Sequence, residues 1–186
     1  PALRLKVGLG TVWFNYAAAI TRGFFFNDTP TTEIYTAVST FLIAFLALMV
    51  GFALSKLPFR RLSLFILGLF GLGYLLSIQS VIIPLFLMLT SVKLTDTHLG
   101  IILVYTAFGL PLAVLLMTQF MRGLPDSLLE SAYIDGASVF RTFLAIMVPM
   151  SIPVIVTVCI ISALGIWNEF LLVLVLASSE FTKSLP

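Results

Sequence analysis

The chain has 186 residues, of which 60% are hydrophobic and 10% are charged, and its mean hydropathy is +1.16. Ordinary soluble domains carry about 25% charged residues, so this composition argues strongly against a water-soluble fold. The net charge of +2, with basic residues scattered along the chain, gives no sign of a nucleic-acid-binding surface. One cysteine, Cys159, and one histidine, His98, provide neither a disulfide framework nor a metal site. We therefore expect an all-α polytopic membrane protein.

The first predicted span covers residues 34–54, which are uniformly apolar. At 1.5 Å per residue such a helix is about 30 Å long, enough to cross the hydrocarbon core. Before it, residues 27–32 form a cluster of turn and capping residues, which predicts a loop. After it, three positive charges surround a proline: Lys56, Arg60 and Arg61.

The second apolar run, from Leu62 to Thr90, is too long for one straight span. Gln79 and Pro84 divide it, which predicts a span over residues 62–82 and a short apolar helix that begins near Pro84. Three glycines in this span lack the spacing of a phosphate-binding loop and favour close helix packing instead: Gly68, Gly71 and Gly73.

Two further spans are predicted over residues 99–121 and 149–177, with a polar elbow over residues 122–148 between them. Pro149 and Pro153 predict a bend at the start of the fourth span. The basic residues that follow the first predicted span place the elbow in the cytoplasm, because five of them fall on its side and two, Lys93 and Lys183, fall opposite. The five are Lys56, Arg60, Arg61, Arg122 and Arg141; three others, Arg4, Lys6 and Arg22, would lie outside and weaken the bias.

Within the elbow, the residues predict two short helices joined at Gly136. Asp126 or Ser127 can cap the first, and Glu130 then lies in its first turn, where the helix dipole favours a negative charge. Gly136 can take the left-handed conformation that closes a helix. The second helix, over residues 139–148, should end at Pro149. The residues alone also permit a simple amphipathic loop on the membrane surface.

Glu169 is the one carboxylate well inside an apolar run. A charge there costs about 2.5–3.5 kcal/mol on insertion scales, so Glu169 should face a water-filled cavity or a partner. Together with Trp167 and Asn168 it would line a polar solute route. The alternative is that Glu169 reaches the outer interface, with Trp167 as a belt residue. Neither a Walker A motif nor a catalytic constellation is present, which indicates that the chain is not an enzyme.

The elbow resembles the EAA loop of binding-protein-dependent ABC importer permeases, which runs Glu-Ala-Ala, three residues, Gly, and later Ile-x-Leu-Pro. Ser131 stands for the first alanine and Val148 for the leucine. Asp135-Gly136-Ala137, with Pro153 after Pro149, is most similar to the carbohydrate-importing branch. Other similar stretches are Trp13–Tyr16, Ala53–Lys56, Ile83–Leu85 and Trp167–Phe170.

This resemblance implies a single permease domain, a transmembrane helix bundle of the type I importer kind. The chain is then expected to be a fragment that holds helices two to five of six. The implied location is the bacterial or archaeal inner membrane, and the implied solute is a sugar or related polyol. The implied partners are a second permease subunit, a cytosolic ATPase dimer, an extracytoplasmic solute-binding protein and membrane lipid.

The resemblance further implies that ATP and Mg are bound by the partner ATPase, so no cofactor or metal is expected in this chain. The coupling role falls on Glu130, Ser131, Ala132, Asp135, Gly136, Ala137 and Pro149. The alternatives are a permease for glycerol phosphate or polyamines, an ion-coupled secondary transporter, or a membrane scaffold that transports nothing.

Overall fold

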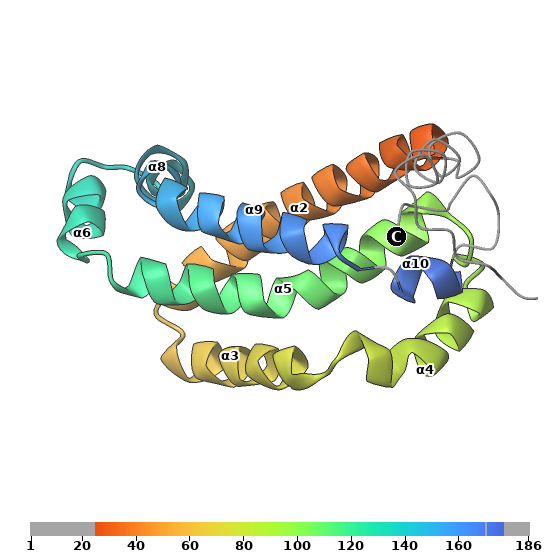
Figure 1. Cartoon of the computed structure of the whole chain (residues 1–186). Helices are drawn as coiled ribbons and strands as arrows, with labels where there is room; N and C mark the ends of the chain where they lie inside the picture. The colour runs from red at the N-terminus through yellow and green to blue at the C-terminus, as the bar shows by residue number, and fades with distance from the viewer. Residues whose placement is uncertain (1–24, 170, 177–186) are drawn as a thin grey trace, which may run out of the picture.

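The computed structural model describes residues 25–169 and 171–176, which form helices joined by short connections (Figure 1). In chain order the elements are α2 (Phe25–Lys56), α3 (Arg60–Leu75), α4 (Ile78–Ser91), α5 (His98–Arg122), α6 (Ser127–Ile134), α7 (Val139–Thr142), the π-helix η1 (Phe143–Met147), α8 (Val148–Met150), α9 (Ile152–Trp167) and α10 (Leu171–Leu176). The expectation of an all-α fold is confirmed for these residues.

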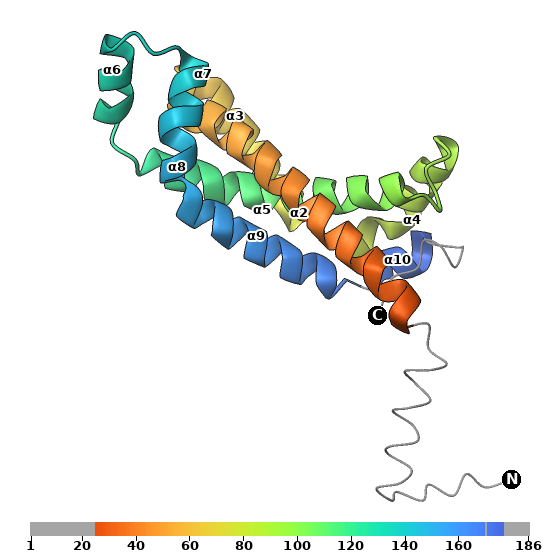
Figure 2. The ribbon, with the colours of Figure 1, turned by 90° about the horizontal axis from the view of Figure 1, so that it is seen from above.

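The centre of the molecule is the pair α2 and α5, which cross one another and are flanked by α9 and α3 (Figure 2). Side chains between them are almost fully buried, among them Ile43, Val114 and Met117. At Gly51 an added Cβ would lie 2.7 Å from the Cβ of Met117, closer than two carbons approach. The missing side chain therefore allows the two backbones to meet, as small residues do between membrane helices.

Two helical segments are long and apolar enough to cross a membrane by themselves: Thr31–Lys56 and His98–Arg122. Two bent pairs qualify when each pair is taken as one span. Arg60–Leu75 and Ile78–Ser91 meet at 99°, and Val139–Met150 and Ile152–Trp167 meet at 69°. The described residues thus hold between two and four candidate spans, and the bend expected near Pro149 and Pro153 is present.

The start of the first span differs from the prediction. Helix α2 begins at Phe25, so residues 27–32 are helical and the predicted loop there is wrong. Asn, Asp and Thr cost a helix less than about 0.7 kcal/mol each, so Pro30, which costs about 3 kcal/mol in a helix interior, is the one residue of this cluster that opposes the helix strongly. Tyr35, one turn further on, is 1% exposed and anchors this end of α2 in the core.

The break in the second apolar run also lies at a different position from the predicted one. The chain breaks at Leu76 and Ser77, whereas Pro84 lies inside α4. The hydroxyls of Ser77 and Ser80 lie 2.8 Å apart at the start of α4, where short polar side chains favour a helix terminus. Among the described residues no atom lies within 4 Å of an added Cβ at Gly68 or Gly71, so the predicted packing role of these two glycines stays a prediction.

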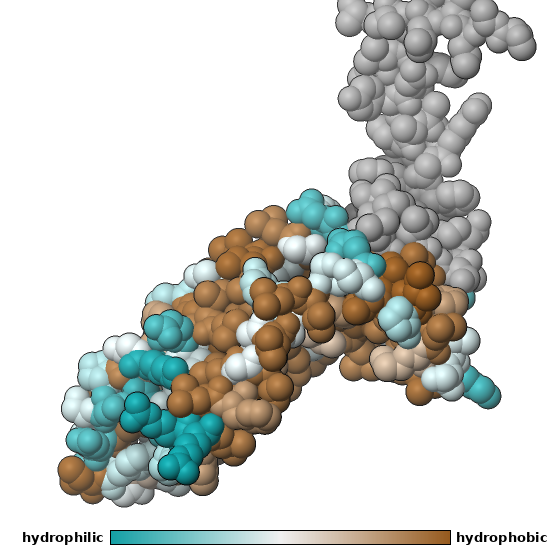
Figure 3. All heavy atoms as spheres, turned by 90° about the horizontal axis from the view of Figure 1, so that it is seen from below, coloured by the Kyte–Doolittle hydropathy of each residue, from teal (hydrophilic) through white to brown (hydrophobic). Residues whose placement is uncertain are grey.

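The surface divides into an apolar body and a polar end. Figure 3 shows hydrophobic residues over most of the visible face, with hydrophilic residues gathered at the end where α6 and the start of α3 lie. Exposed apolar side chains along the body include Phe41, Phe65 and Leu72. A continuous apolar surface of this kind suits contact with lipid or with other membrane helices.

Candidate functional site

The first half of the elbow is α6, a short helix at the polar end of the molecule (Figure 1). Glu130 lies in its first turn and is exposed, as the sequence predicts. Leu129 and Ala132 are buried on the opposite face. Ser131 is exposed, and its Oγ donates to the carbonyl oxygen of Ser127 at 2.8 Å. Helix α6 thus presents a small polar face to the surroundings and keeps an apolar face inward.

The elbow turns at Gly136, which has a φ of 77°. Its N–H donates to the carbonyl of Tyr133 at 3.0 Å, and the N–H of Ala137 donates to the carbonyl of Ala132 at 2.9 Å. These paired bonds form the left-handed helix cap that the sequence predicts at this glycine. No atom lies within 4 Å of an added Cβ at Gly136, so only the backbone conformation requires glycine here.

The second half of the elbow begins at Ser138, whose Oγ accepts from the N–H of Arg141 at 3.3 Å and caps α7. The helix continues through η1 into α8 and ends at Met150, one residue beyond the end predicted at Pro149. Pro149 lies inside this continuous helix, where it supplies no N–H for an i→i−4 bond. The chain then bends at Ser151 into α9.

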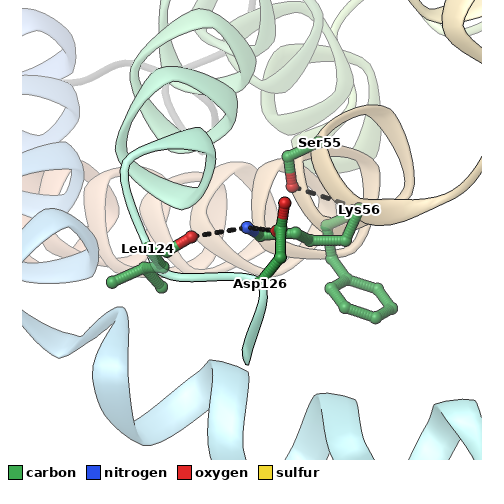
Figure 4. Close-up of polar contacts among 5 residues, drawn as sticks. Ser55, Lys56, Leu124 and Asp126 are labelled. Atoms are coloured by element: carbon green, nitrogen blue, oxygen red, sulfur yellow. Dashed lines mark hydrogen bonds and ion pairs between the residues drawn. The ribbon is translucent and has the colours of Figure 1, made fainter. Parts of the chain in front are cut away.

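The base of the elbow is tied to the end of α2 by Lys56 (Figure 4). Its Nζ lies 2.5 Å from Oδ1 of Asp126 and 2.7 Å from the carbonyl oxygen of Leu124. The side chain of Lys56 is 4% exposed, whereas that of Asp126 is 77% exposed. Asp126 occupies the N-cap position of α6 but makes no capping bond, so the predicted capping role is replaced by this ion pair.

A second set of polar contacts joins α2, α3 and α5 at the same end. Arg122 donates from Nη2 to Oγ of Ser63 at 3.3 Å, and Ser63 in turn donates to the carbonyl oxygen of Leu54. Lys56 and Arg122 therefore lie at one end of the molecule, as the charge bias requires. Arg4, Lys6, Arg22 and Lys183, which also enter that bias, lie outside the described residues, as does the Trp13–Tyr16 stretch.

A cavity of about 310 Å³ lies among α2, α3, α5 and α9. Its walls are mostly apolar, and its polar groups come from Tyr74, Tyr105, Ser162 and Glu169. The hydroxyl of Tyr105 donates to the carbonyl oxygen of Glu169 at 3.2 Å. Oε1 of Glu169 accepts from the N–H of Leu172 at 3.3 Å, at the start of α10. Glu169 thus both borders the cavity and fixes the connection from α9 to α10.

The other two residues of the predicted solute route lie elsewhere. Trp167 is 47% exposed, and neither it nor Asn168 lines the cavity. Nδ2 of Asn168 donates to the carbonyl oxygen of Leu164 at 2.7 Å, which satisfies the end of α9. Sequence reasoning missed Tyr74 and Tyr105, for which the only signal is a polar hydroxyl inside an apolar run. Among the described residues, none of the His, Cys, Asp and Glu groupings could hold a metal ion.

Comparison with known proteins supports the resemblance. Residues 29–185 match the family described as "Binding-protein-dependent transport system inner membrane component". A putative ABC transporter permease from Caldicellulosiruptor is 35% identical over 91% of this chain and 61% of its own length. The diacetylchitobiose uptake permease of Streptomyces coelicolor is 35% identical over 89% of this chain and 55% of its own. The alpha-glucoside transport permease of Rhizobium meliloti is 35% identical over 86% and 42%.

The chain therefore spans between 42% and 61% of the length of these three relatives. Among solved structures, a bacterial ABC transporter involved in the import of the acidic polysaccharide alginate is similar, with a TM-score of 0.75 and 23% identity. The match covers 90% of this chain and 58% of the other. It shows a shared fold.

Proposed function

Because the chain belongs to the family of binding-protein-dependent transport system inner membrane components, we propose that it is part of a membrane-spanning permease subunit of an ATP-driven importer. Its own role is to form a passage and to respond to ATP hydrolysis, while ATP and Mg are bound by a partner ATPase. It is on this proposal a transport subunit and not an enzyme.

One observation carries the proposal: the elbow is built to meet a partner in the aqueous phase. Helix α6 stands at the end of the molecule where hydrophilic residues gather (Figures 1 and 3). Its residues Glu130 and Ser131 are exposed. Left-handed Gly136 turns the chain back without any side chain at that point. A short helix with one negative charge, and with Tyr133 and Ile134 exposed at its end, fits a groove in a second protein that supplies a basic residue and an apolar wall.

We assign the docking contacts with the ATPase dimer to this elbow. The exposed residues Glu130, Ser131 and Asp135 lie where a partner can reach them, and Gly136 allows a close approach. Ala132 is buried and Ala137 half-buried, so these two hold the shape of the elbow. Pro149 lies beyond the π-helix and bears on how the elbow joins α9.

The proposed solute is a sugar or a related polyol. Support comes from similar proteins named for diacetylchitobiose uptake, alpha-glucoside transport and the transport of starch degradation products. The cavity beside α5 adds physical support, because Glu169 and the aromatic residues Tyr74, Tyr105 and Phe108 line the same cavity. Aromatic faces with a few polar groups suit sugar rings.

The remaining partners follow from this role: a second permease subunit, an extracytoplasmic solute-binding protein, and the lipid of a bacterial or archaeal inner membrane. The orientation that couples them places α6 in the cytosol. A cysteine replacing Ser138 should then be labelled from the cytosolic side and one replacing Ser91 from the opposite side, in a Cys159→Ala background. Labelling of Ser138 from outside would remove the coupling role.

The decisive test is purification of the full-length protein with its neighbours, followed by uptake into vesicles. The importer is supported when an ATPase co-purifies and ATP drives uptake of maltose or diacetylchitobiose. Uptake of glycerol 3-phosphate or spermidine instead would retain the permease role but show that the solute is not a sugar. Uptake driven by an ion gradient without ATPase would replace the importer by a secondary transporter, and no uptake at all would favour a scaffold.

A further inference from the structure

One buried lysine fastens the base of the elbow to the end of α2. The ammonium of Lys56 lies between the carboxylate of Asp126 and the carbonyl oxygen of Leu124, at 2.5 and 2.7 Å (Figure 4). With its side chain 4% exposed, Lys56 depends on these two oxygens, because water cannot replace them. The link joins positions that are 70 residues apart in the sequence.

The second half of the elbow is tied to α2 by apolar packing, because the rings of Phe143 in η1 and Phe52 in α2 lie 5.0 Å apart, whereas the polar contacts elsewhere do not duplicate the link at the base of α6. Helix α6 packs mainly on α7, which belongs to the elbow itself. The contacts of Arg122 and Ser63 hold α5 and α3 to α2, but they do not reach α6. In the part of the chain that the structure describes, Lys56 supplies the polar contacts that join residues 124–126 to α2.

We propose that Lys56 is a positioning residue that makes α2 move together with the elbow. This inference rests on the proposed function as an importer permease. When a bound ATPase displaces α6, the ion pair and the hydrogen bond transmit the displacement to the last turn of α2. Helix α2 is continuous from Phe25 to Lys56 and packs along α5, so the movement reaches the opposite end of the span.

The first experiment measures solute transported per ATP hydrolysed by the complete complex in proteoliposomes, with maltose and diacetylchitobiose as probes. Lys56→Met keeps the length of the side chain but removes the ammonium. We expect this ratio to fall about tenfold, which is typical of a coupling interaction between two sites. Lys56→Arg keeps the charge and should restore most of the ratio. Arg61→Met, which removes an exposed cation at the same end, is the matched control and should couple like the wild type.

A double-variant comparison tests whether the pair acts as a unit. Asp126→Ala should lower the ratio, and Lys56→Met combined with Asp126→Ala should fall no further than Lys56→Met alone, since both remove the ion pair between these side chains. Should Lys56→Met fail to assemble, Asp126→Ala, which replaces an exposed side chain, decides the matter. An equal fall in solute transported per ATP hydrolysed for Arg61→Met and Lys56→Met would mean a general effect of lost positive charge and would overturn the inference.

The second experiment follows movement directly, which a merely stabilising role would leave unchanged. Spin labels replace the exposed residues Ser127 at the start of α6 and Ala37 on α2, in a Cys159→Ser background. On addition of Mg-ATP with vanadate, the distance between the labels should stay constant in the otherwise wild-type complex and change in Lys56→Met. A distance that responds identically in both proteins overturns the inference. A wild-type complex without ATP-driven uptake would instead remove the proposed function, so the two failures are distinct.

Discussion

The α2–α5 crossing and the elbow are held together by different physical means. At the crossing, Gly51 lets the two backbones meet, and Met117 and Val114 are fully buried. At the elbow, a left-handed glycine, a serine cap and an ion pair fix the shape, while most side chains remain exposed. Displacing tightly packed apolar side chains costs free energy, whereas short capped helices with exposed side chains can shift together as one unit. The crossing is therefore the rigid frame of the molecule, and the elbow is the exposed part through which a partner can move that frame.

The largest effect should follow from Gly51→Leu, which attacks the frame. Even its Cβ would lie 2.7 Å from Met117 Cβ and 3.3 Å from backbone atoms of Met117 and Thr118, so α2 and α5 must separate. We expect a loss of about 3 kcal/mol or more in the free energy of unfolding, with little assembled protein recovered in detergent. Gly68→Leu is the control, because its surroundings are open. Equal melting temperatures for the two variants would contradict a close crossing.

Gly136→Val should abolish ATP-driven uptake while leaving the frame intact. A β-branched residue at a φ of 77° is strained by about 1–3 kcal/mol, and relief of that strain would redirect α7. Thermal melting of the body should stay near the wild-type value while ATPase binding is lost. Gly136→Asn is the matched control, since asparagine accepts the left-handed conformation, and it should retain most uptake. Normal transport by Gly136→Val would reduce the elbow to a simple loop.

Glu169→Gln probes the cavity that borders the frame. Glutamine keeps an oxygen to accept the N–H of Leu172, so the start of α10 is preserved while the charge is removed. A hydrogen bond from the sugar to a carboxylate is stronger by about 1 kcal/mol than one to a neutral amide. Loss of the charge therefore predicts about a fivefold change in the half-saturating sugar concentration. The assembled complex should be recovered in normal yield. Unchanged uptake kinetics would place Glu169 outside the solute route.

Glu130→Ala should have the smallest effect. Glu130 is a single exposed charge in the first turn of α6, and one such pair at the edge of an interface contributes at most about 1 kcal/mol. We expect the affinity of the permease for the ATPase to fall about threefold. The difference between variant and wild type should shrink as the salt concentration rises. Glu33→Ala, an exposed carboxylate toward the other end of α2, serves as the control. A loss that is insensitive to salt would indicate a structural role for Glu130 instead.

Local rules account for much of what the sequence predicts correctly. The apolar runs of α2 and α5, the placement of Glu130 in a first turn, and the left-handed turn at Gly136 each depend on neighbouring residues. Their signals are periodicity, capping and the conformational freedom of glycine, all of which act over a few residues.

The failures concern contacts that local patterns do not encode. Asp126 is a good capping residue by type, yet a lysine from a distant helix takes its carboxylate. Gly68 and Gly71 have the spacing of a packing motif but no neighbour among the described residues, whereas Gly51, which lies in no glycine cluster, forms the close contact between α2 and α5. Which helices become neighbours is a property of the whole fold, so such pairs cannot be read from one stretch of sequence.

The π-helix η1, in the second half of the elbow, has a consequence for register. A π turn accommodates one residue more than the α-helix around it, so it displaces the side chains on one side of it relative to those on the other. In an α-helix each residue advances the face by about 100°, so removing a single residue within 143–147 would rotate α7 by that amount about its axis. The elbow would then point its proposed docking face in a new direction although every residue on that face was unchanged. On the proposed docking role, the length of this segment, independent of its composition, would set the angle at which the elbow meets the ATPase.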